Sequence, residues 1–112
     1  MEYIKINPEL GDNVQACAWY PVIEVNPKVL KNKKLYDVVI NHERIHLEQQ
    51  KELLIIFFYL LYYLEFIYHY LRTGDAYKAY RSISFEKECY KHQRNLKYLS
   101  KRVRYNYLWK TQ

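Results

Sequence analysis

The sequence predicts an α+β domain, in which a small N-terminal sheet with an edge strand packs on two long helical regions. Strand-like segments lie near the N-terminus, an apolar helical period starts near residue 34, and a second helical region follows the break at Gly74. A chain of 112 residues suits a single core. We therefore treat 1–112 as one domain. Its parts are strands and loops (1–33), a helix with a hydrophobic extension (34–72), and a helical, basic C-terminal segment (84–108).

Composition is that of a globular protein in a reducing compartment. Half of the residues are apolar, which is enough for a core without covalent staples. The two cysteines, Cys17 and Cys89, are too few for a disulfide framework. The N-terminus lacks a basic stretch followed by an apolar run, so we expect no secretory signal and a cytoplasmic protein. Association with a membrane or a virion is the alternative.

Two N-terminal segments are predicted as strands. Residues 2–6, EYIKI, have strand-like alternation. Residues 18–25, AWYPVIEV, are rich in aromatic and β-branched side chains and end at Asn26-Pro27. Pro21 cannot donate a ladder hydrogen bond, so we expect 18–25 to be an edge strand or to carry a bulge.

A helix is predicted to start near Lys34 or Leu35. On a helical projection its apolar side chains gather within about a third of the circumference. His42 and His46 fall on the same side and should point toward the core. The back of the helix is expected to carry Ile40, Arg44, Leu47 and Lys51.

Residues 53–71 are apolar nearly all round and just long enough to span a bilayer. Glu65, His69 and five tyrosines interrupt them, so we favour a buried helix, or one against a hydrophobic partner, over a membrane span. A straight helix would carry the chain far from the histidines. Either it bends after about Gln50 or residues 74–85 return in an extended form. Without Pro or Gly to mark a bend, we favour the extended return.

The stretch NHERIH, residues 41–46, has the spacing of a metal site. His42 and His46 are one helical turn apart, so each can offer a ring nitrogen to one metal ion. Glu43 can reach a water at that metal without itself being a ligand. Zinc lowers the pKa of such a water, and the carboxylate can accept its proton. The alternative is an amphipathic helix with two half-buried, hydrogen-bonded histidines.

A catalytic zinc site needs a third protein ligand, and residues 82–93, SISFEKECYKHQ, offer several. Glu86 and Glu88 are two apart on a helix and face roughly opposite ways. Glu86 shares its side with Cys89, Tyr90 and Gln93, which suit the lining of a site. We therefore choose Glu86.

HExxH followed by a glutamate in a Glu-x-x-(Ala/Cys)-Asp context resembles the gluzincin class of zinc peptidases. Glu86-Lys87-Glu88-Cys89-Tyr90 matches the first four places and departs at the fifth, where Tyr90 replaces the acid that normally supports a histidine ligand. The segments YPVIEVNP, HERIHLEQQ and AYRSISFEKE are similar to those of small metallopeptidase-like proteins of bacteria and bacteriophages, over residues 16–98.

The resemblance implies a minimal zincin-like domain that hydrolyses peptide bonds with one zinc ion per chain. It implies that His42, His46 and Glu86 are the metal ligands and that Glu43 is the general base. It also implies an edge strand that pairs with the substrate backbone, here Trp19, Tyr20, Val22 and Ile23. Tyr90 and His92 are candidates to stabilise the transition state, because such sites need a hydrogen-bond donor there. Cys89 is either near the metal or a small core residue.

The C-terminal segment suggests a different function. The net charge is +6, and residues 91–112 contain seven Lys or Arg and no acid. Such a segment, here 91–110, is a solvated helix face or a contact for nucleic acid, anionic lipid or an acidic protein. The alternative function is therefore a non-enzymatic binding module, for instance a phage structural component, with a degenerate or structural metal site. Residues 53–71 could similarly contact a membrane or a hydrophobic partner.

Overall fold

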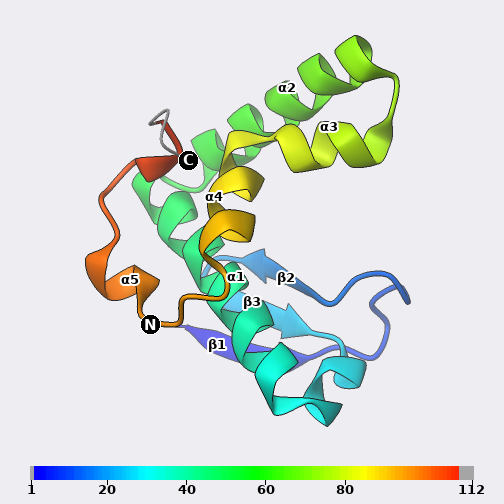
Figure 1. Ribbon diagram of the computed structural model, residues 1–112, viewed down its shortest axis with the longest axis vertical. Coiled ribbons are helices and arrows are strands. Elements are labelled where there is room, and N and C mark those ends of the chain that lie inside the picture. The colour runs from blue at the N-terminus through cyan, green and yellow to red at the C-terminus, as the bar shows by residue number, and fades with distance from the viewer. Residues whose placement is uncertain (1, 109–112) are drawn as a thin grey trace.

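The computed structural model describes residues 2–108 and confirms an α+β architecture (Figure 1). A three-stranded sheet lies at one end, crossed by the long helix α1, and shorter helices pack on the other side of α1 (Figure 1). In chain order the elements are β1 (Tyr3–Ile6), β2 (Ala16–Trp19), β3 (Val22–Val25), the 3-10 helix η1 (Pro27–Lys31), α1 (Lys33–Glu52), α2 (Ile56–Thr73), α3 (Ala76–Ser82), α4 (Ser84–His92), α5 (Tyr98–Lys101) and the 3-10 helix η2 (Asn106–Leu108).

The sheet has the order β1-β3-β2, with β3 parallel to β1 and antiparallel to β2. The expectation of one strand over 18–25 is wrong, because the chain turns at Tyr20-Pro21 and the two halves pair with each other. A proline without an N–H is accommodated in this turn at no cost to the ladder. Val22 and Ile23, predicted for the edge strand, therefore lie in the central strand, while Trp19 lies on the edge strand β2.

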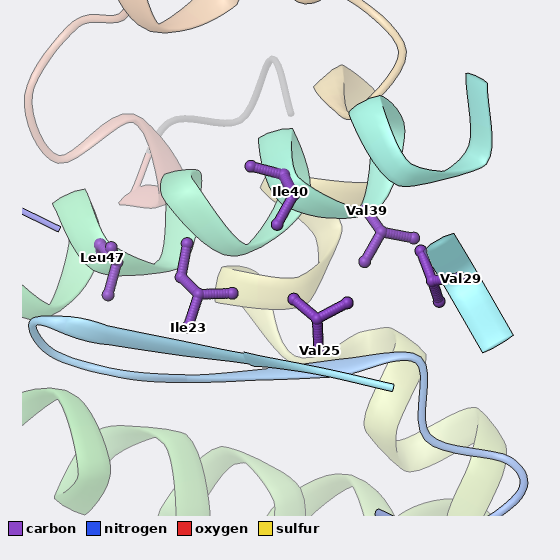
Figure 2. Packing of buried hydrophobic residues seen from close by; sticks show 6 residues of the cluster. All are labelled: Ile23, Val25, Val29, Val39, Ile40 and Leu47. Atoms are coloured by element: carbon purple, nitrogen blue, oxygen red, sulfur yellow. The ribbon is translucent and has the colours of Figure 1, made fainter. Parts of the chain in front are cut away.

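The main core lies between the sheet and α1. Figure 2 shows Ile23 and Val25 of β3 against side chains of α1 and η1, namely Val29, Val39, Ile40 and Leu47. The placement of Ile40 and Leu47 on the back of the helix is wrong, since both are buried against the sheet. Helix α1 is covered on two sides, so its histidines and its sheet-facing residues are all buried.

The chain bends by 112° between α1 and α2. The bend needs no Gly or Pro, because Leu54 and Ile55 adopt positive φ angles of 55° and 65°. Residues 76–82 and 84–92 are helical, so the extended return over 74–85 is wrong and the bend brings the chain back. The bend lets Phe58 pack on Phe85 in a second buried cluster.

Helix α2 is not the buried helix that its composition predicts, because Phe58 is its one buried residue. Within residues 2–108 no single helix is both long and apolar enough to cross a bilayer, and only α1 and α2 taken together across their bend meet that test.

The C-terminal part is not one helix. Helix α4 ends at His92, where the side-chain amide of Asn41 donates to main-chain carbonyls that follow, 2.8 Å from Gln93 O and 3.0 Å from Asn95 O. These contacts satisfy carbonyls at a helix end and fix α4 on α1. Of the basic residues from 91, Arg102 is buried in ion pairs and cannot belong to a solvated binding face, and Lys110 lies outside the described residues.

Candidate metal centre

Helices α1 and α4 bring three predicted ligands together. His42 and His46 lie one turn apart on α1, and Glu86 lies in the first turn of α4. His42 Nε2 is 3.2 Å from Glu86 Oε1, and His46 Nε2 is 3.1 Å from Glu86 Oε2. All three side chains are buried. One carboxylate therefore faces both imidazoles, each through a separate oxygen.

The other ring nitrogen of each histidine is held by a glutamine. His46 Nδ1 lies 2.8 Å from Gln49 Oε1, and His42 Nδ1 lies 2.7 Å from Gln93 Oε1. The amide nitrogen of Gln49 donates to Phe85 O and to a carboxylate oxygen of Glu88, so its oxygen must face the imidazole. An amide oxygen only accepts, and His46 Nδ1 therefore carries the hydrogen. This assigns the His46 Nε2 lone pair to the side that faces Glu86.

The centre favours a positive charge. The lone pair of His46 Nε2 faces a buried carboxylate, and the two repel one another unless a proton or a metal ion lies between them. Although burial disfavours a charged imidazole, Cys89 and Glu86 raise the pKa of His46 well above its ordinary value. Burial likewise disfavours charge on Glu86, but His46 and His42 lower its pKa. The residues present thus fit a divalent cation with nitrogen and oxygen ligands.

Cys89 is a second candidate for the third ligand. His42, His46 and Cys89 offer ligand atoms that lie within 4.8 Å of one another, so this buried group could hold a metal ion. Cys89 Sγ, however, approaches His46 at Nδ1, at 3.5 Å, and Gln49 occupies that nitrogen. Burial raises the pKa of the Cys89 thiol to about 12, which opposes the thiolate that metals bind. Glu86, which faces Nε2 of both histidines, has the better geometry.

Tyrosines from two helices hold the Glu86 carboxylate. Tyr62 of α2 donates to Glu86 Oε2 at 2.6 Å, and Tyr80 of α3 donates to Oε1 at 3.2 Å. The Tyr80 hydroxyl lies 2.9 Å from that of Tyr90, whose ring packs edge-on against His42 at 4.8 Å between centroids. Tyr90, where the sequence departs from the expected acid, therefore contacts the predicted ligand His42 through its ring.

Glu43 lies beside the histidines, at the floor of the cleft. Burial raises the pKa of its carboxyl group, and the nearby His46 and His42 oppose that rise. Within residues 2–108 its side chain makes no hydrogen bond. A carboxylate without a competing partner is available to accept a proton at the cleft.

The centre opens into a cleft of about 1440 Å³ between β2, α1 and α2. Asn26 N donates to Gln15 O, and β2 pairs Cys17 with Glu24. In an antiparallel pair, alternate residues bond to the partner strand, so Gln15 and Cys17 face β3. The main-chain groups of Ala16 and Ala18 therefore point the other way, along the open edge. Gln50 of α1 binds the end of this edge, because its amide donates to Ala18 O and accepts from Tyr20 N. Ala16 and Ala18, not Val22 and Ile23, present the edge.

The structure does not bring His92 to the cleft. Its ring stacks on Tyr98 at 3.8 Å between centroids, and Tyr98 donates to Glu88. Glu88 and Glu52 share Arg102 in a buried ion-pair network beneath the centre.

Sequence reasoning named Gln93 as lining on the side of Glu86 but missed three other residues that support the centre. Gln49, three residues after His46, lies on the same helical face, so spacing could have found it. Nothing in the local sequence marks Tyr62 or Tyr80, because they reach Glu86 through the bend between α1 and α2 and through α3. No protein-family model, curated protein or solved structure matches this chain.

Proposed function

We propose that this protein is a zinc-dependent peptidase of zincin-like fold that hydrolyses peptide bonds with a metal-activated water. The observation that carries the proposal is the pairing of His42 Nε2 and His46 Nε2 with the two oxygens of Glu86 at 3.2 and 3.1 Å. Two imidazoles and one carboxylate are a ligand set of catalytic zinc sites and leave a fourth position for water. A bound zinc ion supplies a Lewis acid that lowers the pKa of water and polarises a carbonyl.

Residues of the chain supply the remaining functions. Glu43 accepts a proton from the attacking water and passes it to the leaving amine. Gln49 and Gln93 keep the Nδ1 hydrogens in place and aim both Nε2 atoms inward. The tyrosine hydroxyls on Glu86 hold the carboxylate in the orientation that faces both histidines.

The open edge of β2 supports a peptide substrate. The outward main-chain groups of Ala16 and the N–H of Ala18 border the same cleft as His42 and Glu43, while Ala18 O accepts from Gln50. An extended peptide can add to such an edge by main-chain hydrogen bonds, with little dependence on its sequence.

A Glu43→Gln substitution tests the proposal. The substitution keeps the shape of the side chain and removes the base, so peptide hydrolysis should fall by about 10²- to 10⁴-fold while bound zinc is unchanged. Glu48→Gln is the matched control, because Glu48 is on the same helix but pairs with Lys51 at the surface. Hydrolysis of an unstructured protein substrate and zinc content are measured on each variant.

Loss of hydrolysis in Glu43→Gln alone, with zinc retained, supports the peptidase. Equal hydrolysis by Glu43→Gln and the unsubstituted protein would exclude Glu43 as the base. A protein that binds zinc and hydrolyses no peptide bond would reduce the centre to a structural metal site.

A further inference from the structure

Helix α2 carries an apolar stripe on its outer face. At 100° per residue, six side chains fall within about 100° of the helix circumference. Each is more than half exposed, and Leu71 and Ile56 reach 80% and 74%. The stripe consists of Ile56, Phe57, Leu60, Leu64, Ile67 and Leu71.

Tyrosines flank the stripe on both sides. Tyr63 and Tyr70 lie along one border and Tyr68 along the other, and all three are exposed. Stripe and borders together cover about half of the helix circumference. Tyrosines beside an aliphatic face are typical of helices that lie at the boundary between lipid tails and headgroups, because the ring is apolar and the hydroxyl stays hydrated.

Charges around the stripe favour an anionic surface. Glu65, the acid of α2, turns inward and accepts hydrogen bonds from the N–H and hydroxyl of Ser84. Arg72 is at the exposed end of the helix and Lys78 follows on α3, while Asp75 between them caps α3 with its side chain. The chain as a whole has a net charge of +6. Basic residues beside an exposed apolar helix face are the combination by which peripheral proteins bind anionic bilayers.

We propose that the protein docks on anionic lipid bilayers through the outer face of α2, which lies in the plane of the membrane surface. No single helix of residues 2–108, α2 included, is long and apolar enough to cross a bilayer. A second copy of the chain fits the stripe less well for two reasons. A single helix packed on α2 would cover only about a third of its circumference, less than the exposed apolar face. Dimerisation would also bring together two chains that each carry a net charge of +6. A bilayer into which the helix sinks covers the wider face.

Docking would also place the cleft at the lipid surface. Tyr63 belongs both to the border of the stripe and to the lining of the cleft. The inner side of α2 holds Glu86 through Tyr62, so the helix joins the lipid-facing surface to the candidate centre. The docking itself does not depend on the proposed peptidase activity.

Flotation with vesicles tests the proposal on the full chain. The vesicles are an equimolar mixture of phosphatidylcholine and phosphatidylglycerol. The test variant carries Leu60→Glu and Leu64→Glu in the stripe, and we expect its partition to fall at least about tenfold, because two apolar side chains are lost from the lipid-facing surface. The matched control carries Ile6→Glu and Val103→Glu, two exposed apolar positions elsewhere with the same change in charge.

Flotation of the unsubstituted protein and of the control, with loss in the stripe variant, supports docking through α2. Absence of flotation in the unsubstituted protein overturns it. Equal partition of both variants also overturns it, since the basic residues alone would then suffice. A dimer in sedimentation that dissociates in the stripe variant, without flotation, would assign the face to a second copy. Circular dichroism confirms that each variant is folded.

Discussion

Gln49 connects His46 to Glu88, because its amide oxygen lies 2.8 Å from His46 Nδ1 and its amide nitrogen lies 2.9 Å from Glu88 Oε1. The Glu88 carboxylate is in turn fixed by Arg102 and Tyr98. The orientation of a proposed metal ligand thus depends on a buried ion pair behind it. A neutral amide performs here the orienting role that a carboxylate often has beside a metal-bound histidine.

Gln49→Met should weaken zinc binding by about 10- to 100-fold, because His46 loses the acceptor that fixes its ring. Competition with a chelator of known affinity measures the change. Gln50→Met is the matched control: Gln50 is equally buried on the same helix, but its amide contacts the hairpin backbone. Its substitution should lower stability and leave zinc affinity unchanged. Equal zinc affinity in the two variants would contradict the role of Gln49.

Tyr62→Phe should lower zinc affinity by about tenfold, because Glu86 Oε2 loses a hydrogen bond of 2.6 Å and the carboxylate gains freedom to turn away. Tyr59→Phe is the control, since Tyr59 lines the cleft from the same helix and makes no hydrogen bond to Glu86. The same chelator competition applies. Unchanged affinity in Tyr62→Phe would show that α2 is not needed to position the ligand.

Arg102→Met should lower the free energy of unfolding by about 3–5 kcal/mol at neutral pH, because the carboxylates of Glu88 and Glu52 lose the cation that they share. Arg104→Met, at an exposed position, should change it by less than about 0.5 kcal/mol. Denaturant unfolding measures both. If Arg102→Met lowered the free energy of unfolding no more than Arg104→Met does, the ion pairs of Arg102 would have to be exposed to solvent.

The effect of Arg102→Met should depend on pH. Burial opposes the charge on Glu88, but hydrogen bonds from Arg102, Tyr98 and Gln49 lower the pKa of this carboxyl group. A lowered carboxyl pKa stabilises the folded state above the unfolded value of about 4.3, and this stabilisation is lost as the pH falls through the folded pKa. The difference in free energy of unfolding between Arg102→Met and the unsubstituted protein should therefore be largest near neutral pH and become smaller below about pH 4.

Leu54→Gly should raise the free energy of unfolding by roughly 1 kcal/mol, because Leu54 is exposed and adopts a positive φ that glycine adopts without strain. Leu60→Gly, in the middle of α2, should lower it by about 1 kcal/mol. Thermal unfolding compares them. Destabilisation by both would mean that the chain continues as a helix through residue 54.

The sequence predicted which side chains come together at the candidate centre better than it predicted the path of the chain. Helical spacing alone brings His42 and His46 to one side, and it also separates Glu86 from Glu88. The bend at Leu54 could not be predicted, because it has no Gly or Pro and is imposed by the packing of Phe58 on Phe85. The exposure of α2 could not be predicted either. An apolar composition indicates that a helix is stable in an apolar environment, but it does not show whether that environment is the core of the same chain or an external partner.

Bound metal in purified protein, measured by elemental analysis beside single-alanine variants, tests the central claim most directly. We predict about one zinc ion per chain in the unsubstituted protein and in Cys89→Ala, and loss of zinc in His46→Ala and in Glu86→Ala. Retention of zinc in Glu86→Ala with loss in Cys89→Ala would assign the third ligand to the thiol. An absence of zinc from every sample, even after zinc is supplied, would contradict the metal centre itself.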